Sequence, residues 1–219
     1  MDERNGLAVP RTLDEMCDPG RLALLVYDMQ TGVLGQIGDR DRVVGRVAEV
    51  LDAARAAGVR TVFLRHVTLP TALMGAGQLR MWRSWQRAGS AAEVVSAFPP
   101  DAQQTRIVPE LRPTEHEAVL DKVTMSAFEG TWLDIVLRDC GITAVALVGV
   151  ATEIGIEPTA RHAADLGYVP VVVTDACGAG DAEAAERALA GLRFAGDSLL
   201  TTAGEFRAAL ARHRPRAQE

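Results

Sequence analysis

Apolar runs of strand length alternate with longer segments of helical periodicity along most of the chain. Nearly every position in these runs is hydrophobic, as in strands covered on both faces of a parallel sheet; they span residues 22–28, 59–64, 118–120, 144–148, 169–173 and 198–200. Segments with apolar residues at helical spacing lie between them, over 41–57, 131–139, 158–166 and 183–194. This alternation predicts a three-layer α/β fold, with a mostly parallel six-stranded sheet and helices on both faces.

The stretch over residues 68–113 interrupts this alternation. It is too long for a plain connection, and long insertions in compact domains are often lids or binding loops. Trp82 and Trp85 lie three positions apart within it. Two interpretations stay open: the tryptophans cover a pocket, or they lie on one face of a helix that packs on the core.

The length of the chain predicts one domain. Its 219 residues are enough to bury one sizeable core, and 48% of them are hydrophobic while 24% are charged, an ordinary composition for a globular protein. We therefore expect a single domain over residues 1–219, with a possible lid over 68–113 and a frayed tail over 212–219.

Charge and the N-terminal residues exclude several classes of partner. The formal net charge of −6 and the pI near 5.3 disfavour binding to nucleic acid or to an anionic membrane surface. The first residues are acidic and no apolar signal segment follows them, and the longest apolar runs are too short to span a bilayer. We expect a cytoplasmic protein.

The three cysteines do not form a recognisable framework. Cys17, Cys140 and Cys177 make an odd number without CxxC spacing, so neither disulfides nor a zinc site is indicated. We expect three reduced thiols.

Polar residues that end apolar strands are the first candidates for a site, because ligands of open parallel sheets bind beyond the carboxyl ends of the strands. Asp28, His66 and Lys122 each end or follow such a run, and the turn over 149–155 follows another. A carboxylate beside an ammonium in a desolvated cleft can share a proton. The alternatives are that Asp28 caps the next helix and that Lys122 is a solvated loop residue.

Three segments together resemble the isochorismatase-like hydrolases. They are Ala-Leu-Leu-Val-Tyr-Asp-Met-Gln over 23–30, Lys122 with Ser126-Ala127-Phe128, and Gly-Val-Ala-Thr-Glu-Ile-Gly over 149–155. The similarity runs from about residue 22 to residue 205, and it implies a Rossmann-like α/β hydrolase. Relatives commonly form homo-oligomers, so the resemblance also implies a homo-oligomer.

The resemblance assigns two catalytic residues and removes a third. In cysteine hydrolases of this superfamily an Asp, a Lys and a Cys form the catalytic triad, and the first two fall on Asp28 and Lys122. The cysteine position falls on Gly155, which has no side chain to form a thioester. Cys177, at the end of another strand, is either a relocated nucleophile of an amidase or an apolar filler.

Isochorismatases, which lack this cysteine and act without covalent catalysis, offer a model for the chemistry. Asp28 would act as general acid or base, with a pKa raised by burial against the opposing effect of Lys122. The glutamine-bearing segment of true isochorismatases is missing from residues 65–70, so isochorismate itself is not favoured. The competing hypothesis is an inactive member that binds a small molecule or a partner.

The family turn implies a way to bind the substrate. It usually contains a cis peptide before the residue that matches Ala151, and backbone N–H groups of Val150, Ala151 and Gly155 would then form a cradle for an acyl or carboxylate group. An ordinary strand-to-helix connection is the alternative. We expect a small anionic substrate, with these candidate binding residues: Val150, Ala151, Gly155, His66, Trp82, Trp85 and Phe128.

Cofactors are not expected. Some members bind zinc through an Asp-x-His-x-x-His arrangement, but His66 has no second histidine close by in the sequence. We expect neither a metal nor an organic cofactor.

Overall fold

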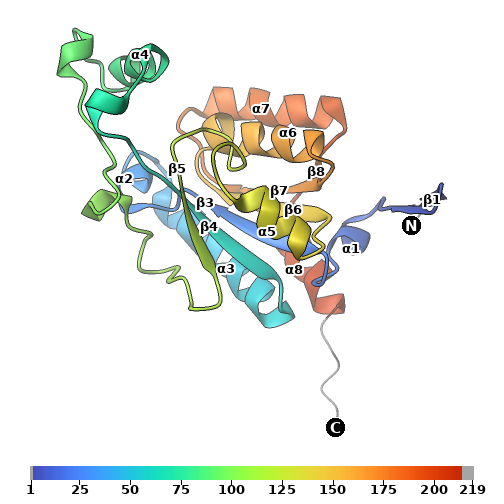
Figure 1. Cartoon of the computed structure of the whole chain (residues 1–219). Helices are drawn as coiled ribbons and strands as arrows, with labels where there is room; N and C mark the ends of the chain where they lie inside the picture. Colours follow the sequence, from blue (N-terminus) through green and yellow to red (C-terminus); the bar gives the residue numbers. More distant parts are fainter. Residues whose placement is uncertain (1, 214–219) are drawn as a thin grey trace.

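A six-stranded parallel sheet forms the centre of the molecule in the computed structural model, which describes residues 2–213 (Figure 1). In spatial order its strands are β5 (Ala118–Lys122), β4 (Arg60–His66), β3 (Leu22–Tyr27), β6 (Ala144–Gly149), β7 (Val169–Cys177) and β8 (Leu199–Thr201). Every neighbouring pair in this sheet is parallel. The predicted parallel six-stranded sheet is therefore confirmed.

Helices cover both faces of the sheet, so the side chains of the central strand β3 are buried on both faces. All six residues of β3 are buried; Leu24 belongs to the core under one face and Leu25 to the core under the other. The first face carries α3 (Arg40–Ala57) and α8 (Ala203–Arg212). The second carries α5 (Leu133–Asp139), α6 (Glu157–Asp165) and α7 (Ala182–Ala195).

The predicted helices are present, with shifted ends where side chains cap the backbone. The hydroxyl of Thr131 accepts a hydrogen bond from the Leu133 N–H (3.2 Å), so Thr131 precedes α5 instead of forming its first turn. Before α6 the chain forms a π-helix, η4 (Thr152–Ile156). As predicted, α3 stops at Gly58, whose φ of 74° suits glycine.

Several short elements and the helix α8 were not predicted, and a helix in the insertion was only one of two open interpretations. A Thr202–Glu205 capping box begins α8. Near the N-terminus the chain forms the hairpin β1 (Asp2–Arg4) and β2 (Leu7–Val9), then α1 (Leu13–Met16), and α2 (Thr31–Leu34) follows β3. The tail predicted over 212–219 begins inside α8, and its residues 214–219 lie outside the described residues.

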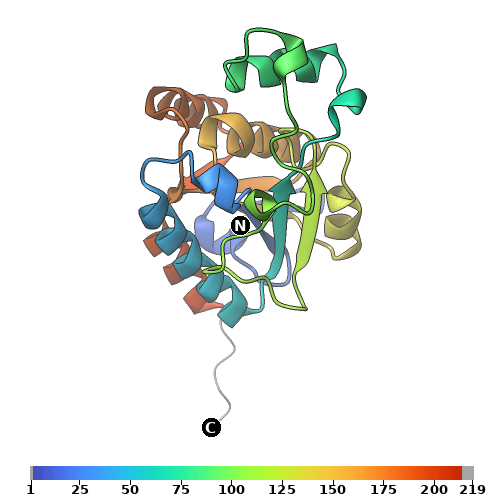
Figure 2. The same cartoon turned by 90° about the vertical axis from the view of Figure 1, so that its left-hand side faces the viewer.

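The insertion between β4 and β5 projects from one corner of the molecule (Figure 2). It contains η1 (Thr71–Leu73), α4 (Ala76–Trp85), η2 (Ala91–Glu93) and η3 (Gln103–Thr105). A separate small core, made of Met74, Trp82, Val94 and Phe98, holds part of it together. The insertion thus has an apolar centre of its own beside those of the sheet.

The strand order places a crevice next to β3. The chain runs from β3 to β4 and β5 on one side, and then returns to β6 on the other side of β3. The connections after β3 and β6 therefore diverge, and the carboxyl ends of these strands form a switch point, where ligands of open α/β sheets bind. Within residues 2–213, no helix has the length and apolar character needed to cross a membrane.

Candidate active site

Asp28 and Lys122 form a buried ion pair at this edge of the sheet. Asp28 follows β3 and Lys122 ends β5, and the Lys122 Nζ donates to Asp28 Oδ2 at 2.9 Å. Only 1% of the lysine side chain and 10% of the aspartate side chain are exposed. The Nζ also donates to the Thr124 carbonyl (3.2 Å) and lies 4.1 Å from the centroid of the Tyr27 ring. The predicted convergence of the two strand ends is therefore observed.

Burial and the ion pair act on the two pKa values in opposite directions. Burial raises the pKa of Asp28 to about 6, although Lys122 and hydrogen bonds lower it. Burial likewise lowers the pKa of Lys122, against the attraction of Asp28. Asp28 is thus a carboxyl group that titrates close to neutral pH.

Local backbone structure holds Asp28 in place. Its φ of 47° is in the left-handed region, and its N–H donates to the Leu64 carbonyl at 3.0 Å. Next to it, the fully buried Gln30 side chain donates to the carbonyls of His66 (2.9 Å) and Thr105 (3.0 Å) and accepts from the His66 N–H (2.7 Å). Gln30 therefore connects the Asp28 segment to β4 and to the insertion.

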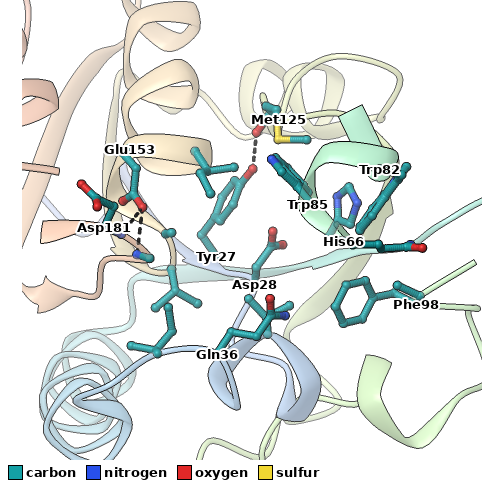
Figure 3. A pocket seen from close by; sticks show the side chains of 18 residues that line it. Tyr27, Asp28, Gln36, His66, Trp82, Trp85, Phe98, Met125, Glu153 and Asp181 are labelled. Atoms are coloured by element: carbon teal, nitrogen blue, oxygen red, sulfur yellow. Dashed lines mark hydrogen bonds between the residues drawn. The ribbon is translucent and has the colours of Figure 1, made fainter. Parts of the chain in front are cut away.

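A cavity of about 510 Å³ opens beside Asp28 (Figure 3). That volume suits a small molecule. Asp28 lies between two kinds of wall, with Glu153 and Asp181 on one side and aromatic residues on the other. The remaining lining comes mostly from Tyr27, Val33, Gln36, Ile37, Met125, Val150, Ala151 and Ile154.

The aromatic wall consists of His66, Trp82, Trp85 and Phe98. The ring centroids of Trp82 and Trp85 lie 5.2 Å apart in an edge-to-face arrangement, and those of His66 and Trp82 lie 5.8 Å apart. Trp82 is 6% exposed and belongs to the small core, whereas Trp85 is 45% exposed. Both interpretations of the tryptophans thus hold for Trp82, which packs and lines the cavity, while Trp85 mainly lines it.

His66 is an uncharged member of this wall. Burial, and then the charge of Lys122, lower its pKa to about 3. Its Nε2 is buried and has no hydrogen-bond partner among the described residues.

The acidic wall comes from two turns that sequence analysis did not connect. Glu153 Oε1 accepts from the N–H groups of Gly180 (2.8 Å) and Asp181 (2.9 Å), while its buried Oε2 has no partner among the described residues. Asp181 Oδ1 accepts from the Ala184 N–H (2.7 Å) and so caps α7. In the sequence, the available signal for Asp181 was its position as the N-cap of α7. No arginine or lysine is among the lining residues, which argues against the predicted anionic substrate.

The turn after β6 presents fewer free N–H groups than expected. The Val150–Ala151 peptide is cis, as the resemblance implied. The Val150 N–H donates to the Tyr27 carbonyl (3.0 Å) and the Gly155 N–H to the Ala151 carbonyl (2.9 Å). The Ala151 N–H has no acceptor among the described residues. Of the predicted cradle, only Ala151 keeps a free donor, and Gly155 is not among the lining residues.

Tyr27 occupies the space beside Gly155. A Cβ built on Gly155 would lie 2.2 Å from Tyr27 Cε1 and 2.4 Å from Cζ, distances that no real Cβ shows. The phenol donates to the Met125 carbonyl, and the residue is 2% exposed. Sequence analysis missed Tyr27; the signal was an aromatic residue in an otherwise aliphatic strand, directly before Asp28.

Two other candidates lie away from the cavity. Phe128 stacks on Tyr168 with ring centroids 5.8 Å apart and packs in the core beneath α5 and α6. Contrary to the prediction, it does not line the cavity. Cys177 is buried against the Leu147 carbonyl, and burial raises the pKa of its thiol to about 12. Across residues 2–213, no three His, Cys, Asp or Glu side chains are grouped so that they could hold a metal ion.

Comparisons with known proteins show the family of the chain. An isochorismatase domain model matches residues 22–204. The isochorismatase family protein YecD of Escherichia coli O157:H7 is 33% identical over 175 residues, which cover 74% of this chain and 81% of YecD. The ureidoacrylate amidohydrolase RutB of Pantoea ananatis is 28% identical over 199 residues, covering 78% of this chain and 74% of RutB.

A solved structure supports the same relationship. The N-carbamoylsarcosine amidase of Thermoplasma acidophilum superposes with a TM-score of 0.66 and 25% identity, covering 84% of this chain and 96% of the amidase. The sheet order, the paired Asp28 and Lys122, the domain match over most of the chain and these relatives lead to one conclusion. The protein belongs to the isochorismatase-like hydrolase family.

Proposed function

We propose that the protein hydrolyses a small molecule without a covalent enzyme intermediate, with Asp28 as general base and acid and Lys122 as its electrostatic partner. The observation that carries this proposal is the contact between Tyr27 and Gly155. Because the Tyr27 ring lies where a side chain on residue 155 would begin, a nucleophile at that position is excluded by volume as well as by the glycine itself.

The cysteines elsewhere in the chain support the same proposal. Burial raises the pKa of both Cys17 and Cys177 to about 12, so at neutral pH neither forms the thiolate that attacks a substrate. None of the three cysteines, Cys17, Cys140 and Cys177, lines the cavity beside Asp28. The chemistry therefore falls to Asp28 and a water molecule.

Asp28 suits proton transfer at neutral pH. With a pKa of about 6 the carboxyl group is mostly ionised at pH 7, and it stays basic enough to accept a proton. In the proposed reaction Asp28 takes a proton from water, whose oxygen attacks an acyl carbon of the substrate. The tetrahedral intermediate then expels the leaving nitrogen or oxygen, which receives the proton from Asp28.

Lys122 and Ala151 would assist at two other points. Lys122 stabilises the ionised carboxylate at 2.9 Å and limits its orientation. Ala151 lines the cavity and its N–H has no acceptor among the described residues, which supports a role as donor to the oxyanion of the intermediate. The relatives named as amidohydrolase and amidase make C–N bonds of amide or carbamoyl type the first substrates to screen, with vinyl ethers next.

The setting of this activity is also part of the proposal. We infer a cytoplasmic enzyme that acts on a small molecule. Its net charge of −6 disfavours binding to nucleic acid or to an anionic membrane surface. The family resemblance adds a homo-oligomer, which sedimentation velocity would test.

The test compares Asp28→Asn with a matched control. Asp28→Asn keeps the shape and removes the titratable group, so the rate should fall about 10²- to 10⁴-fold. The control is Asp121→Asn, one position before Lys122, where the side chain pairs with Arg65 outside the cavity. Asp121→Asn should leave the rate within about twofold of wild type.

Alkylation separates the proposal from a thiol mechanism. Iodoacetamide should leave turnover of the wild-type protein largely intact. Complete inactivation with a mass adduct on Cys177, together with an active Asp28→Asn variant, would overturn the proposal in favour of a relocated cysteine.

A further inference from the structure

The cavity beside Asp28 is lined by carboxylates without matching cations. Asp28, Glu153 and Asp181 contribute three carboxylates to its lining, and no lysine or arginine is among the lining residues. Two of these carboxylates, Glu153 and Asp181, come from turns that approach each other at one end. A ligand at that end meets concentrated negative charge.

The cations near the cavity are already committed elsewhere. Lys122 is 2% exposed and bonded to Asp28 and to the Thr124 carbonyl, so its charge offsets that of Asp28. Arg42 lines a neighbouring hollow, where it binds Asp39 (2.8 Å) and the Asp175 carbonyl (2.8 Å). Neither cation contacts Glu153 or Asp181. Among the described residues these two carboxylates accept hydrogen bonds only from backbone N–H groups, so no side-chain cation offsets their charge.

Three buried polar side-chain atoms without a partner lie around the same cavity. Within residues 2–213 these side-chain atoms are Asp28 Oδ1, His66 Nε2 and Glu153 Oε2, and all three residues line this one cavity. Asp28 and His66 are each only 7% exposed. Buried polar atoms are normally hydrogen-bonded, so their concentration around one cavity is typical of a site completed by a ligand.

The opposite end of the cavity is apolar. Trp82, Trp85 and Phe98 form it, and Asp28 lies between it and the acidic end (Figure 3). A ligand that fills both ends therefore carries a cationic group at one end and an apolar or aromatic group at the other.

We propose that the cavity selects a ligand with an ammonium or guanidinium group, bound by Glu153 and Asp181, and an apolar or aromatic group against Trp82 and Trp85. This deepens the proposed function, on which it rests only in placing the scissile bond over Asp28. It replaces the anionic substrate that the sequence led us to expect.

Binding of unreactive probes tests the charge preference without any turnover. The probes are phenylalkylammonium ions with ethyl, propyl and butyl chains, each matched to the alcohol and the carboxylate of the same length. Isothermal titration calorimetry on the full chain should show that at least one ammonium probe binds tenfold or more tightly than its alcohol, and that the carboxylates bind weakest.

Variants of the two acidic residues test whether they cause the preference for ammonium over alcohol probes. Glu153→Gln and Asp181→Asn keep acceptor oxygens for the backbone N–H groups of Gly180, Asp181 and Ala184, so the two turns should keep their shape. Each should reduce the ammonium preference several-fold, and the double variant should abolish it while alcohol binding stays unchanged. Glu183→Gln, on α7 and paired with Arg187, removes a carboxylate outside the cavity and should change nothing.

Three results would overturn the proposal: equal binding of ammonium and alcohol, tightest binding of a carboxylate, or no binding of any probe. An ammonium preference that survives in the Glu153→Gln/Asp181→Asn variant would overturn the assignment of these residues. The proposed function fails separately, through an active Asp28→Asn variant, because the probes contain no hydrolysable bond.

Discussion

The floor of the cavity and its aromatic wall are built on different parts of the molecule. The floor consists of Tyr27 and Asp28, at the end of β3, with Lys122 of β5 bonded to Asp28 behind it; all three residues are buried. Of the aromatic wall, His66 ends β4, but Trp82, Trp85 and Phe98 belong to the projecting insertion, whose small core holds only a few side chains. The floor is therefore placed by the whole fold, whereas the wall depends mainly on a local cluster.

This difference indicates a division of tasks. Groups that transfer protons need fixed distances, and the sheet supplies them through the hydrogen bonds around Gln30 and the 2.9 Å ion pair. Groups that recognise the apolar part of a ligand can tolerate movement, and an insertion can change in sequence without disturbing the sheet. Changes in the floor should thus affect stability and rate together, and changes in the wall should affect binding.

Removing Lys122 should have the largest effect. Lys122→Met leaves the Asp28 carboxylate buried without its partner, which costs about 3–5 kcal/mol for a buried pair. Urea denaturation at pH 7 should show this loss, and Asp28→Asn/Lys122→Met should recover part of it. The exposed pair of Glu183 and Arg187 is the control, because Glu183→Gln should change stability little. Equal losses at both pairs would contradict the contrast between a buried floor and the surface.

Filling the space at residue 155 should have the next largest effect. Gly155→Cys forces a Cβ against the Tyr27 ring, and overpacking of this kind costs about 1–3 kcal/mol. The double variant Tyr27→Val/Gly155→Cys removes the clash. Its loss of unfolding free energy should therefore be smaller than the sum of the losses in the two single variants. A double-mutant cycle in urea measures this coupling. Additive effects would mean that Tyr27 and Gly155 do not share one space.

Acidic pH should lower activity through Asp28. As its ionised form is the proposed base, kcat/KM should fall about tenfold per pH unit below the pKa of about 6. The sign for stability is opposite. The pKa of Asp28 in the folded protein lies above its ordinary value of 3.8, so this group favours folding at lower pH, and that contribution is lost as pH rises through about 6. A rate that instead falls above pH 6 would make Asp28 the proton donor of the first step.

Trp85 should show the smallest effect on stability. Since it is 45% exposed, Trp85→Ala should leave the urea midpoint nearly unchanged and weaken binding of phenylbutanol and phenylbutylammonium alike, by about 1 kcal/mol or roughly fivefold. Val95→Ala, at an exposed position in the same insertion that does not line the cavity, should affect neither. Cooperative loss of structure in Trp85→Ala would instead make this tryptophan part of the core.

Local sequence patterns determined the secondary structure of the sheet and part of the site. The apolar run over 22–28 predicted β3 because a strand buried on both faces needs hydrophobic residues at every position. Gly58 marked the end of α3 because a left-handed residue stops a helix there. Asp28 and Lys122 were accessible to prediction because polar residues at the ends of parallel strands meet at one edge of the sheet, and three short motifs pointed to them.

Only the tertiary structure decided what surrounds that pair. Whether Gly155 leaves an empty space or adjoins an occupied one depends on the Tyr27 ring, which comes from a strand far away in the sequence. The acidic wall likewise requires the turn at Glu153 to reach the turn at Asp181. The sequence pattern records which side chains are present and which way a strand or helix turns them. It does not record which distant side chains compete for one volume, because that depends on the packing of the complete chain.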